Sequence, residues 1–138
     1  AVCAAAVADY GVKASAQKQK KAANKSGLDI EFTENPDILH TLSNHKDRPD
    51  FVIGFAAETE NLIENAKGKL SRKNCDAIIA NNVGNSDKPV FGSDQTSVHW
   101  ITKSANNSYE SLSKTDVAVM ITDKITAHFI NQKKDKAA

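Results

Sequence analysis

The chain opens on Val2-Cys3-Ala4-Ala5-Ala6-Val7-Ala8-Asp9, seven small or apolar residues followed by a carboxylate. Continuous apolarity of this kind is typical of a strand buried on both faces of a parallel sheet. The segment therefore predicts a strand over residues 2–8 that ends on Asp9. Domains rarely begin with their central strand, so we expect this chain to be the C-terminal part of a larger fold whose first units are missing.

Further strands are predicted along the chain. Apolar runs at residues 51–55 and 77–80 indicate two more buried strands. Alternating polarity indicates a half-exposed strand over residues 28–32 and an edge strand over residues 97–101. Helical patterns separate these runs. Buried strands that alternate with helices are typical of an α/β fold, here a Rossmann-like, doubly wound, mainly parallel sheet. Such sheets bind ligands at the carboxyl ends of their strands.

Three helices are predicted. Asn35 is expected to cap a short helix through Leu42, with Pro36 at its first position. A second, over residues 58–70, is amphipathic, and the capping-box pattern of residues 113–116 begins a third. The residues expected to face inward are Leu62, Ile63, Ala66 and Leu70 on the second helix, and Val117, Met120, Ile121, Ile125 and Phe129 on the third.

Composition excludes several functional classes. The 138 residues fit one domain. A net charge of +1 is too small to produce a positive electrostatic field over the whole protein that would attract nucleic acid. No apolar run approaches the ~18 residues of a membrane span. Cys3 and Cys75 lie far apart without ligand spacing, which is typical of free thiols in a reducing cytoplasm, the expected location. The four histidines share no ligand spacing either.

The strongest local signal is a basic segment directly after Asp9. Residues 10–28 contain five lysines and no acid. Lys18, Lys20 and Lys21 could neutralise a triphosphate, although a charge run of this kind is also typical of a solvated surface. Asp9 could hold Mg²⁺ or a ribose hydroxyl, or it could be an ordinary turn aspartate.

Other candidate residues have equally open interpretations. Lys69 and Lys73 lie on one helix face at i and i+4, where they could contact an anion or simply complement the helix dipole. Phe55 could pack against a base or belong to the core. Asn81 and Asn82 could bind a ligand or turn the chain. The sequence contains no Walker loop, nucleophile elbow or complete dinucleotide fingerprint.

Several segments, taken in order, resemble the ligase domain of bacterial phosphopantothenate–cysteine ligase (phosphopantothenoylcysteine synthetase). The matching blocks are residues 5–10, 18–21, 35–39, 54–59, 72–76, 80–81 and 91–94. Each block alone is weak, but the ordered set is specific and covers nearly the whole chain. The chain is identified on this basis as similar to the C-terminal part of that ligase domain.

The resemblance implies a reaction and a site. Bacterial members of the family use CTP and join 4′-phosphopantothenate to cysteine in coenzyme A biosynthesis, through an acyl-cytidylate, releasing CMP and pyrophosphate. It implies catalytic roles at the phosphates for Lys18, Lys20 and Lys21, and Mg²⁺ at Asp9. The residues that it implies for nucleotide binding are Cys3, Ala4, Ala5, Asp9, Lys18, Pro36, Asp37, Ile38, Leu39, Phe55, Lys69 and Lys73.

The resemblance also implies an organisation. Residues 1–132 would be the C-terminal portion of one CTP-binding ligase domain, with a flexible flap over residues 10–28. Independently of the resemblance, the lysine-rich composition of residues 133–138 predicts a disordered tail. The flap would contribute to a homodimer, and a flavin-dependent decarboxylase could be fused upstream in the full-length protein. Because the preceding half of the ligase domain is not in this sequence, the isolated chain is expected to be inactive.

Two other functional classes remain open on the sequence. One is a non-catalytic nucleotide-binding or dimerisation fragment. The other is an RNA-binding domain that uses the lysine flap, which is disfavoured because the eight aromatic residues are scattered rather than gathered into a stacking platform.

Overall fold

A five-stranded sheet and a separate two-stranded ribbon make up the strands of the computed structural model, which describes residues 1–14, 16, 30–84 and 94–135. In spatial order the sheet contains β1 (Val2–Cys3), β4 (Ile53–Glu58), β5 (Ala77–Asn82), β6 (Gln95–Thr102) and β7 (Asn106–Ser113). β1, β4 and β5 pair in parallel, whereas β6 is antiparallel to both β5 and β7. Four of the five strands therefore run in the same direction, and the predicted mainly parallel sheet is confirmed.

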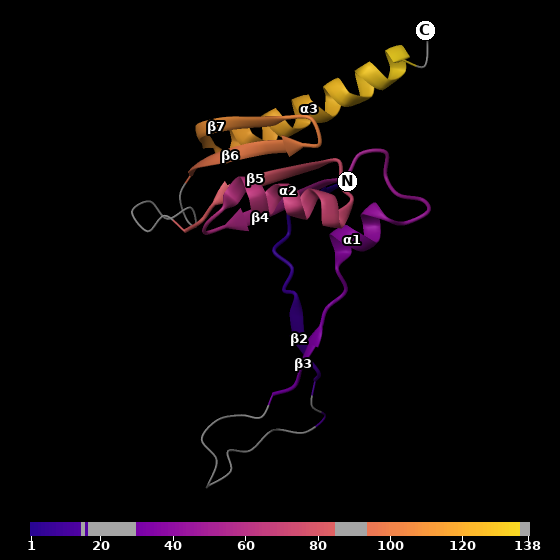
Figure 1. Cartoon of the computed structure of the whole chain (residues 1–138), viewed down its shortest axis with the longest axis vertical. Helices are drawn as coiled ribbons and strands as arrows, with labels where there is room; N and C mark the ends of the chain where they lie inside the picture. The colour runs from indigo at the N-terminus through magenta and orange to yellow at the C-terminus, as the bar shows by residue number, and fades with distance from the viewer. Residues whose placement is uncertain (15, 17–29, 85–93, 136–138) are drawn as a thin grey trace.

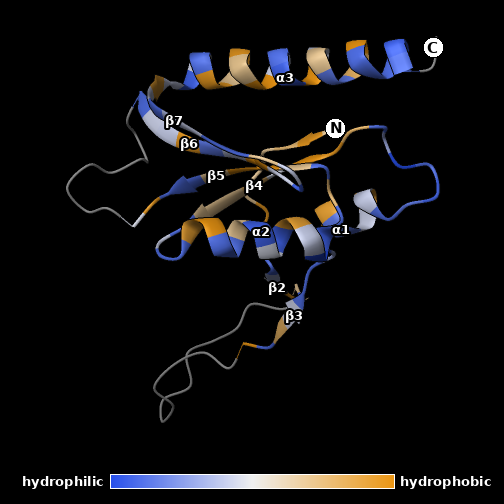
Figure 2. Ribbon diagram, turned by 45° about the horizontal axis from the view of Figure 1, so that its top comes forward, coloured by the Kyte–Doolittle hydropathy of each residue, from blue (hydrophilic) through white to orange (hydrophobic). Residues whose placement is uncertain are grey.

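Helices cover both faces of this sheet (Figure 2). α1 (Ile38–Ser43) and α2 (Leu62–Lys73) lie on one face, and α3 (Lys114–Asp135) lies on the other. The predicted doubly wound α/β fold is therefore confirmed. None of the helices within the described ranges is long and apolar enough to cross a membrane.

Two apolar layers hold the helices to the sheet. On the α3 side, Ile53, Ile79 and Trp100 pack with Val117 and Ile121 of the helix. The second layer contains Val52, Ile78, Ile101 and, from α2, Ala66 and Leu70, with Leu62 and Ile63 packed against it. The central strands are thus covered on both faces, which explains their continuous apolar sequences.

Gly54 allows α1 to approach the sheet closely. A Cβ atom at this position would lie 2.5 Å from Cδ2 of Leu39 and 2.9 Å from Cδ1 of Ile78. Because such distances are sterically excluded, the absence of a side chain at Gly54 lets Leu39 pack directly on β4.

The ribbon stands away from the main sheet (Figure 1). It pairs β2 (Tyr10–Val12) antiparallel with β3 (Phe32–Glu34), with Val12 opposite Phe32 and Tyr10 opposite Glu34. The strand predicted over residues 28–32 therefore begins only at Phe32 within the described residues. Most of the predicted flap, including Lys18, Lys20 and Lys21, lies outside them.

Two strand predictions were wrong. The strand predicted over residues 2–8 is only two residues long, and among the described strands it lies at the edge of the sheet, paired with β4 alone. It is not buried on both faces, since Val2 is 45% exposed. The strand predicted at the sheet edge, β6, is instead an inner strand. β7 lies outside it and was missed because its largely exposed residues show no apolar alternation.

The helix ends also differ from the predictions. The cap of α1 is Asp37 rather than Asn35, since the Asp37 carboxylate accepts a hydrogen bond from the amide of His40. The capping box at the start of α3 is confirmed, with Ser113 Oγ accepting from the Asp116 amide at 3.0 Å. Phe129 is 37% exposed rather than buried. The tail predicted to be disordered from residue 133 is helical as far as Asp135, where the described part of the chain ends.

Candidate functional site

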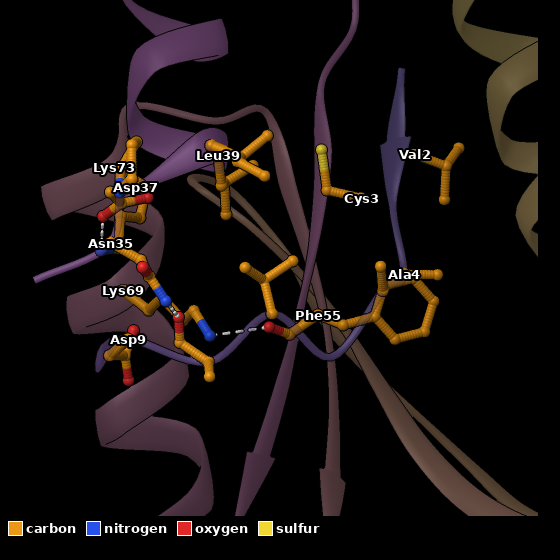
Figure 3. Close-up of a pocket in the computed structure, with 15 residues that line it drawn as sticks. Val2, Cys3, Ala4, Asp9, Asn35, Asp37, Leu39, Phe55, Lys69 and Lys73 are labelled. Atoms are coloured by element: carbon orange, nitrogen blue, oxygen red, sulfur yellow. Dashed lines mark hydrogen bonds and ion pairs between the residues drawn. The ribbon is translucent and has the colours of Figure 1, made fainter. Parts of the chain in front are cut away.

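A cavity of about 360 Å³ lies at the carboxyl end of β1, beside β4 (Figure 3). Its walls come from the segment that follows β1, the turn that leads into α1, and the C-terminal half of α2. The lining residues are Val2, Cys3, Ala4, Ala5, Val7, Ala8, Asp9, Asn35, Pro36, Asp37, Ile38, Leu39, Phe55, Lys69 and Lys73. Its position agrees with the rule that ligands of α/β sheets lie beyond the carboxyl ends of parallel strands.

Asn35 fixes the wall that contains Asp9. The backbone N–H of Asn35 donates to the Asp9 carbonyl at 2.8 Å, and its side-chain Nδ2 donates to the Ala8 carbonyl at 2.9 Å. These two bonds join the segment that precedes β2 to the segment that follows β3, at the point where both border the cavity. Asp9 itself is exposed, so its carboxylate is accessible to a ligand.

Asp37, two residues after Asn35, forms an ion pair with Lys73 in the cavity wall. One carboxylate oxygen of Asp37 pairs with the Lys73 ammonium, and the other accepts the amide of His40. Partial burial acts to raise the pKa of Asp37, but the Lys73 hydrogen bond and the His40 amide outweigh it and hold the pKa below the ordinary value of 3.8. Asp37 is therefore ionised at neutral pH.

Lys69 ties α2 to the strand that borders the cavity. Its ammonium donates to the backbone carbonyl of Phe55 at 2.8 Å (Figure 3). Lys69 and Lys73 are one helical turn apart, so both reach the same wall. Two cations and the exposed Asp9 carboxylate thus face one space, an arrangement that suits an anionic ligand accompanied by a metal ion.

The structure brings together eleven of the twelve residues that the family resemblance implies for nucleotide binding. Cys3 to Ala5, Asp9, Pro36 to Leu39, Phe55, Lys69 and Lys73 all line this cavity. The twelfth, Lys18, and the other two lysines of the predicted catalytic set lie outside the described residues.

Four lining residues were not predicted as site residues: Val2, Val7, Ala8 and Asn35. Of these, only Asn35 offered a signal, since an asparagine before Pro36 is constrained to an extended conformation. The same asparagine was predicted to cap α1, whereas Asp37 is the cap.

A second cavity, of about 260 Å³, lies between α3 and the sheet. Asn81 lines it together with Phe55, which borders both cavities. Asn82, the other asparagine considered, accepts the Gly84 amide at 2.9 Å and turns the chain.

The described residues of the cavity are better suited to a metal ion that binds together with a ligand than to a metal ion held by protein side chains alone. Among the described residues, no group of three or more His, Cys, Asp or Glu side chains could hold a metal ion. Asp37 is already paired with Lys73, whereas Asp9, the other carboxylate in the cavity wall, has no ion-pair partner among the residues that the structure describes. Mg²⁺ is commonly held by one or two carboxylates together with substrate phosphates and water, and Asp9 fits that role.

The fold and the cavity define a doubly wound α/β domain with a charged ligand site at its strand ends. Residues 1–129 match the model of the family described as "DNA/pantothenate metabolism flavoprotein C-terminal domain". The chain belongs to this family.

Two bacterial proteins are similar to this chain in sequence. The chain is 36% identical over 126 residues to the coenzyme A biosynthesis bifunctional protein CoaBC of Haemophilus influenzae, a match that covers 91% of this chain and 30% of that protein. It is 38% identical over 116 residues to the CoaBC of Borreliella burgdorferi, covering 83% of this chain and 28% of the relative. The chain therefore spans about a third or less of the length of these relatives.

Solved structures show the same architecture. The C-terminal domain of a coenzyme A biosynthesis bifunctional protein CoaBC superposes with a TM-score of 0.59 at 31% identity, covering 74% of this chain and 46% of that one. The DNA/pantothenate metabolism flavoprotein from Streptococcus pneumoniae gives a TM-score of 0.57 at 20% identity, covering 72% of this chain and 43% of that structure, a likeness of fold alone.

Proposed function

We propose that this chain is part of a coenzyme A biosynthesis enzyme and forms the CTP site of a phosphopantothenate–cysteine ligase. The observation that carries the proposal is the assembly of the cavity. Eleven of the residues that the family resemblance implies for nucleotide binding come from four separate stretches of sequence and line one cavity. They give this cavity cationic, acidic and apolar side chains. Membership of the family supports the same proposal.

The proposed reaction has two steps. A carboxylate oxygen of 4′-phosphopantothenate attacks the α-phosphorus of CTP, the bond to the bridging oxygen breaks, and pyrophosphate leaves. The cysteine amine then attacks the acyl carbon, the bond to the phosphate oxygen breaks, CMP leaves, and the nitrogen releases a proton to solvent as the amide forms. Because a carboxylic acid with a pKa of about 4.3 is already ionised at neutral pH, the first step needs no general base. The lack of a nucleophile elbow in the sequence is therefore consistent with this chemistry.

The residues of the cavity would bind and orient the nucleotide rather than transfer protons. Cys3, Ala4 and Ala5 are small, so the ligand can approach their backbone closely. Phe55 would frame the nucleotide, and Lys69 and Lys73 would offset its negative charge. Mg²⁺, held by Asp9 together with the phosphates, would supply further neutralisation of that charge. Lys18, Lys20 and Lys21 are proposed to contact the phosphates.

Calorimetry tests this proposal directly. The chain is titrated with CTP, ATP and a short oligonucleotide, each with Mg²⁺. Binding of CTP in preference to ATP supports the ligase, whereas weak binding of both nucleotides favours a non-catalytic module. Steeply salt-dependent oligonucleotide binding would favour an RNA-binding function. The chain alone is expected to bind without turnover, so amide formation by it would contradict that part of the proposal.

We propose that the chain acts as a homodimer, with the β2–β3 ribbon in the interface. Tyr10, Val12 and Phe32 lie on one face of the ribbon, and each is more than half exposed. An isolated two-stranded ribbon is marginally stable in water, so a partner surface on this face would stabilise it.

A further inference from the structure

We infer that Asn35 is a positioning residue that sets the direction of the Asp9 carboxylate in the cavity. The inference rests on the proposed function, since it assigns to Asp9 the role of contacting the nucleotide or its cation. Asn35 connects β3 to the start of α1 and lines the same cavity as Asp9.

The segment that carries Asp9 has little structure of its own. Residues 4–9 belong to no helix or strand. In the described structure, a hydrogen bond from the Val7 amide to the Ala5 carbonyl lies within the segment, and the bonds at Ala8 and Asp9 come from Asn35. The placement of Asp9 therefore depends on a residue that follows it by more than twenty positions.

Asn35 controls the two peptide groups that flank the Asp9 Cα atom. The Ala8 carbonyl belongs to the peptide group before that atom, and the Asp9 carbonyl belongs to the one after it. Asn35 donates to the first at 2.9 Å and to the second at 2.8 Å. Because peptide groups are planar, holding both of them restricts φ and ψ of Asp9, and with them the direction of the Cα–Cβ bond from which the carboxylate extends.

Two neighbours restrict Asn35 in turn. Pro36 disfavours a helical backbone at the residue that precedes it, which keeps Asn35 extended. Gly11 leaves space for the Asn35 side chain, since a Cβ atom at Gly11 would lie 2.7 Å from Oδ1 and 3.3 Å from Nδ2 of Asn35. The amide is thus held between the ribbon and the turn into α1.

A double-mutant cycle on CTP–Mg²⁺ affinity tests the inference, with Asn35→Ala made both in the unmodified chain and in Asp9→Asn. If Asn35 acts through Asp9, Asn35→Ala weakens binding about tenfold in the unmodified chain and has little effect in the Asp9→Asn background. Asn106→Ala, an exposed asparagine of β7, serves as the control and should leave affinity unchanged. The melting temperature of each variant reports its folding.

The outcomes separate this inference from the proposed function. An equal loss of affinity in both backgrounds would overturn the positioning role and leave the nucleotide site standing, as would no loss in either. Failure of the unmodified chain to bind CTP would overturn the proposed function and the inference together. Gly11→Ala, which crowds the Asn35 side chain, should reproduce the loss seen with Asn35→Ala, and normal affinity in Gly11→Ala would also contradict the inference.

Discussion

Lys69 donates its ammonium hydrogen to the backbone carbonyl of Phe55 over 2.8 Å, and this bond joins the middle of α2 to the strand beside the cavity. The lysine is partly buried. A residue that spacing alone would place on a solvated helix surface is thus built into the cavity wall.

Replacing Lys69 by methionine keeps most of the side-chain volume and removes the cation. We expect the free energy of unfolding to fall by about 1–2 kcal/mol, because the Phe55 carbonyl loses a charged donor. CTP affinity should fall roughly tenfold, equivalent to about 1.4 kcal/mol. Denaturant unfolding and calorimetry measure the two effects. Lys67→Met, on an exposed position of the same helix, is the control, and an equal loss of CTP affinity in it would argue against a specific role for Lys69.

The ion pair of Asp37 with Lys73 predicts a pH dependence of stability. The folded-state pKa of Asp37 lies below its ordinary value of 3.8, so the unfolded chain binds the proton more tightly. The carboxylate therefore contributes stability above about pH 4, and that contribution is lost as pH falls through the folded-state pKa. The stability difference between the unmodified chain and Asp37→Asn should shrink over this acid range. A difference that stays constant with pH would contradict the assignment.

The two cysteines should differ in reactivity. Cys75 is 1% exposed, and burial raises the pKa of its thiol above the ordinary value of 9.0, so it should react with iodoacetamide only on unfolding. Cys3 is half-buried in the cavity wall and should react in the folded chain. Peptide mass spectrometry should show that CTP with Mg²⁺ protects Cys3. Unchanged labelling of Cys3 at saturating CTP would place the nucleotide elsewhere.

Charge on the ribbon should weaken self-association. Val12→Glu introduces a carboxylate on the face that Val12 shares with Phe32, and we expect the dissociation constant of the dimer to rise about tenfold or more. Val119→Glu on α3 is a matched control, since Val119 is 54% exposed and Val12 is 57% exposed. Light scattering over a concentration series measures the dimer fraction. Equal dimerisation in both variants would exclude the ribbon from the interface.

Alanine at two glycines should have opposite effects on stability. Gly54→Ala brings a Cβ atom against Leu39 and Ile78, and overpacking of this kind typically costs about 1–3 kcal/mol. Gly68→Ala lies within α2, where the new methyl group meets only the flexible end of Arg72, and a gain of about 0.5–1 kcal/mol is expected. Denaturant unfolding gives both values. A neutral Gly54→Ala would show that α1 can move away from β4 at little cost.

The central part of the fold was predictable from the sequence because local pattern and tertiary environment agree there. β4 and β5 are covered on both faces, so their apolar runs indicate strands directly. β7 lacks such a pattern, because most of its side chains are exposed and only Tyr109 and Leu112 pack against the core. The short β1 was overestimated because small apolar residues also suit a cavity wall.

The candidate site was predictable mainly through resemblance. Spacing placed Lys69 and Lys73 on one helix face but could not supply their partners, the Phe55 carbonyl and Asp37, which come from other parts of the chain. Asn35 was visible as a turn residue. Its hydrogen bonds to Ala8 and Asp9 depend on the fold, because the pairing of β2 with β3 brings the residue after β3 next to the residues before β2.

The cavity walls are drawn from residues 2 to 73, so a molecule that occupies the space binds only when those distant stretches have come together. Such a molecule acts as a folding ligand. At a concentration a hundredfold above its dissociation constant it would add about 2.7 kcal/mol to the stability of the native state. A thermal-shift screen of metabolites on this chain would therefore report its natural ligand without any assay of catalysis.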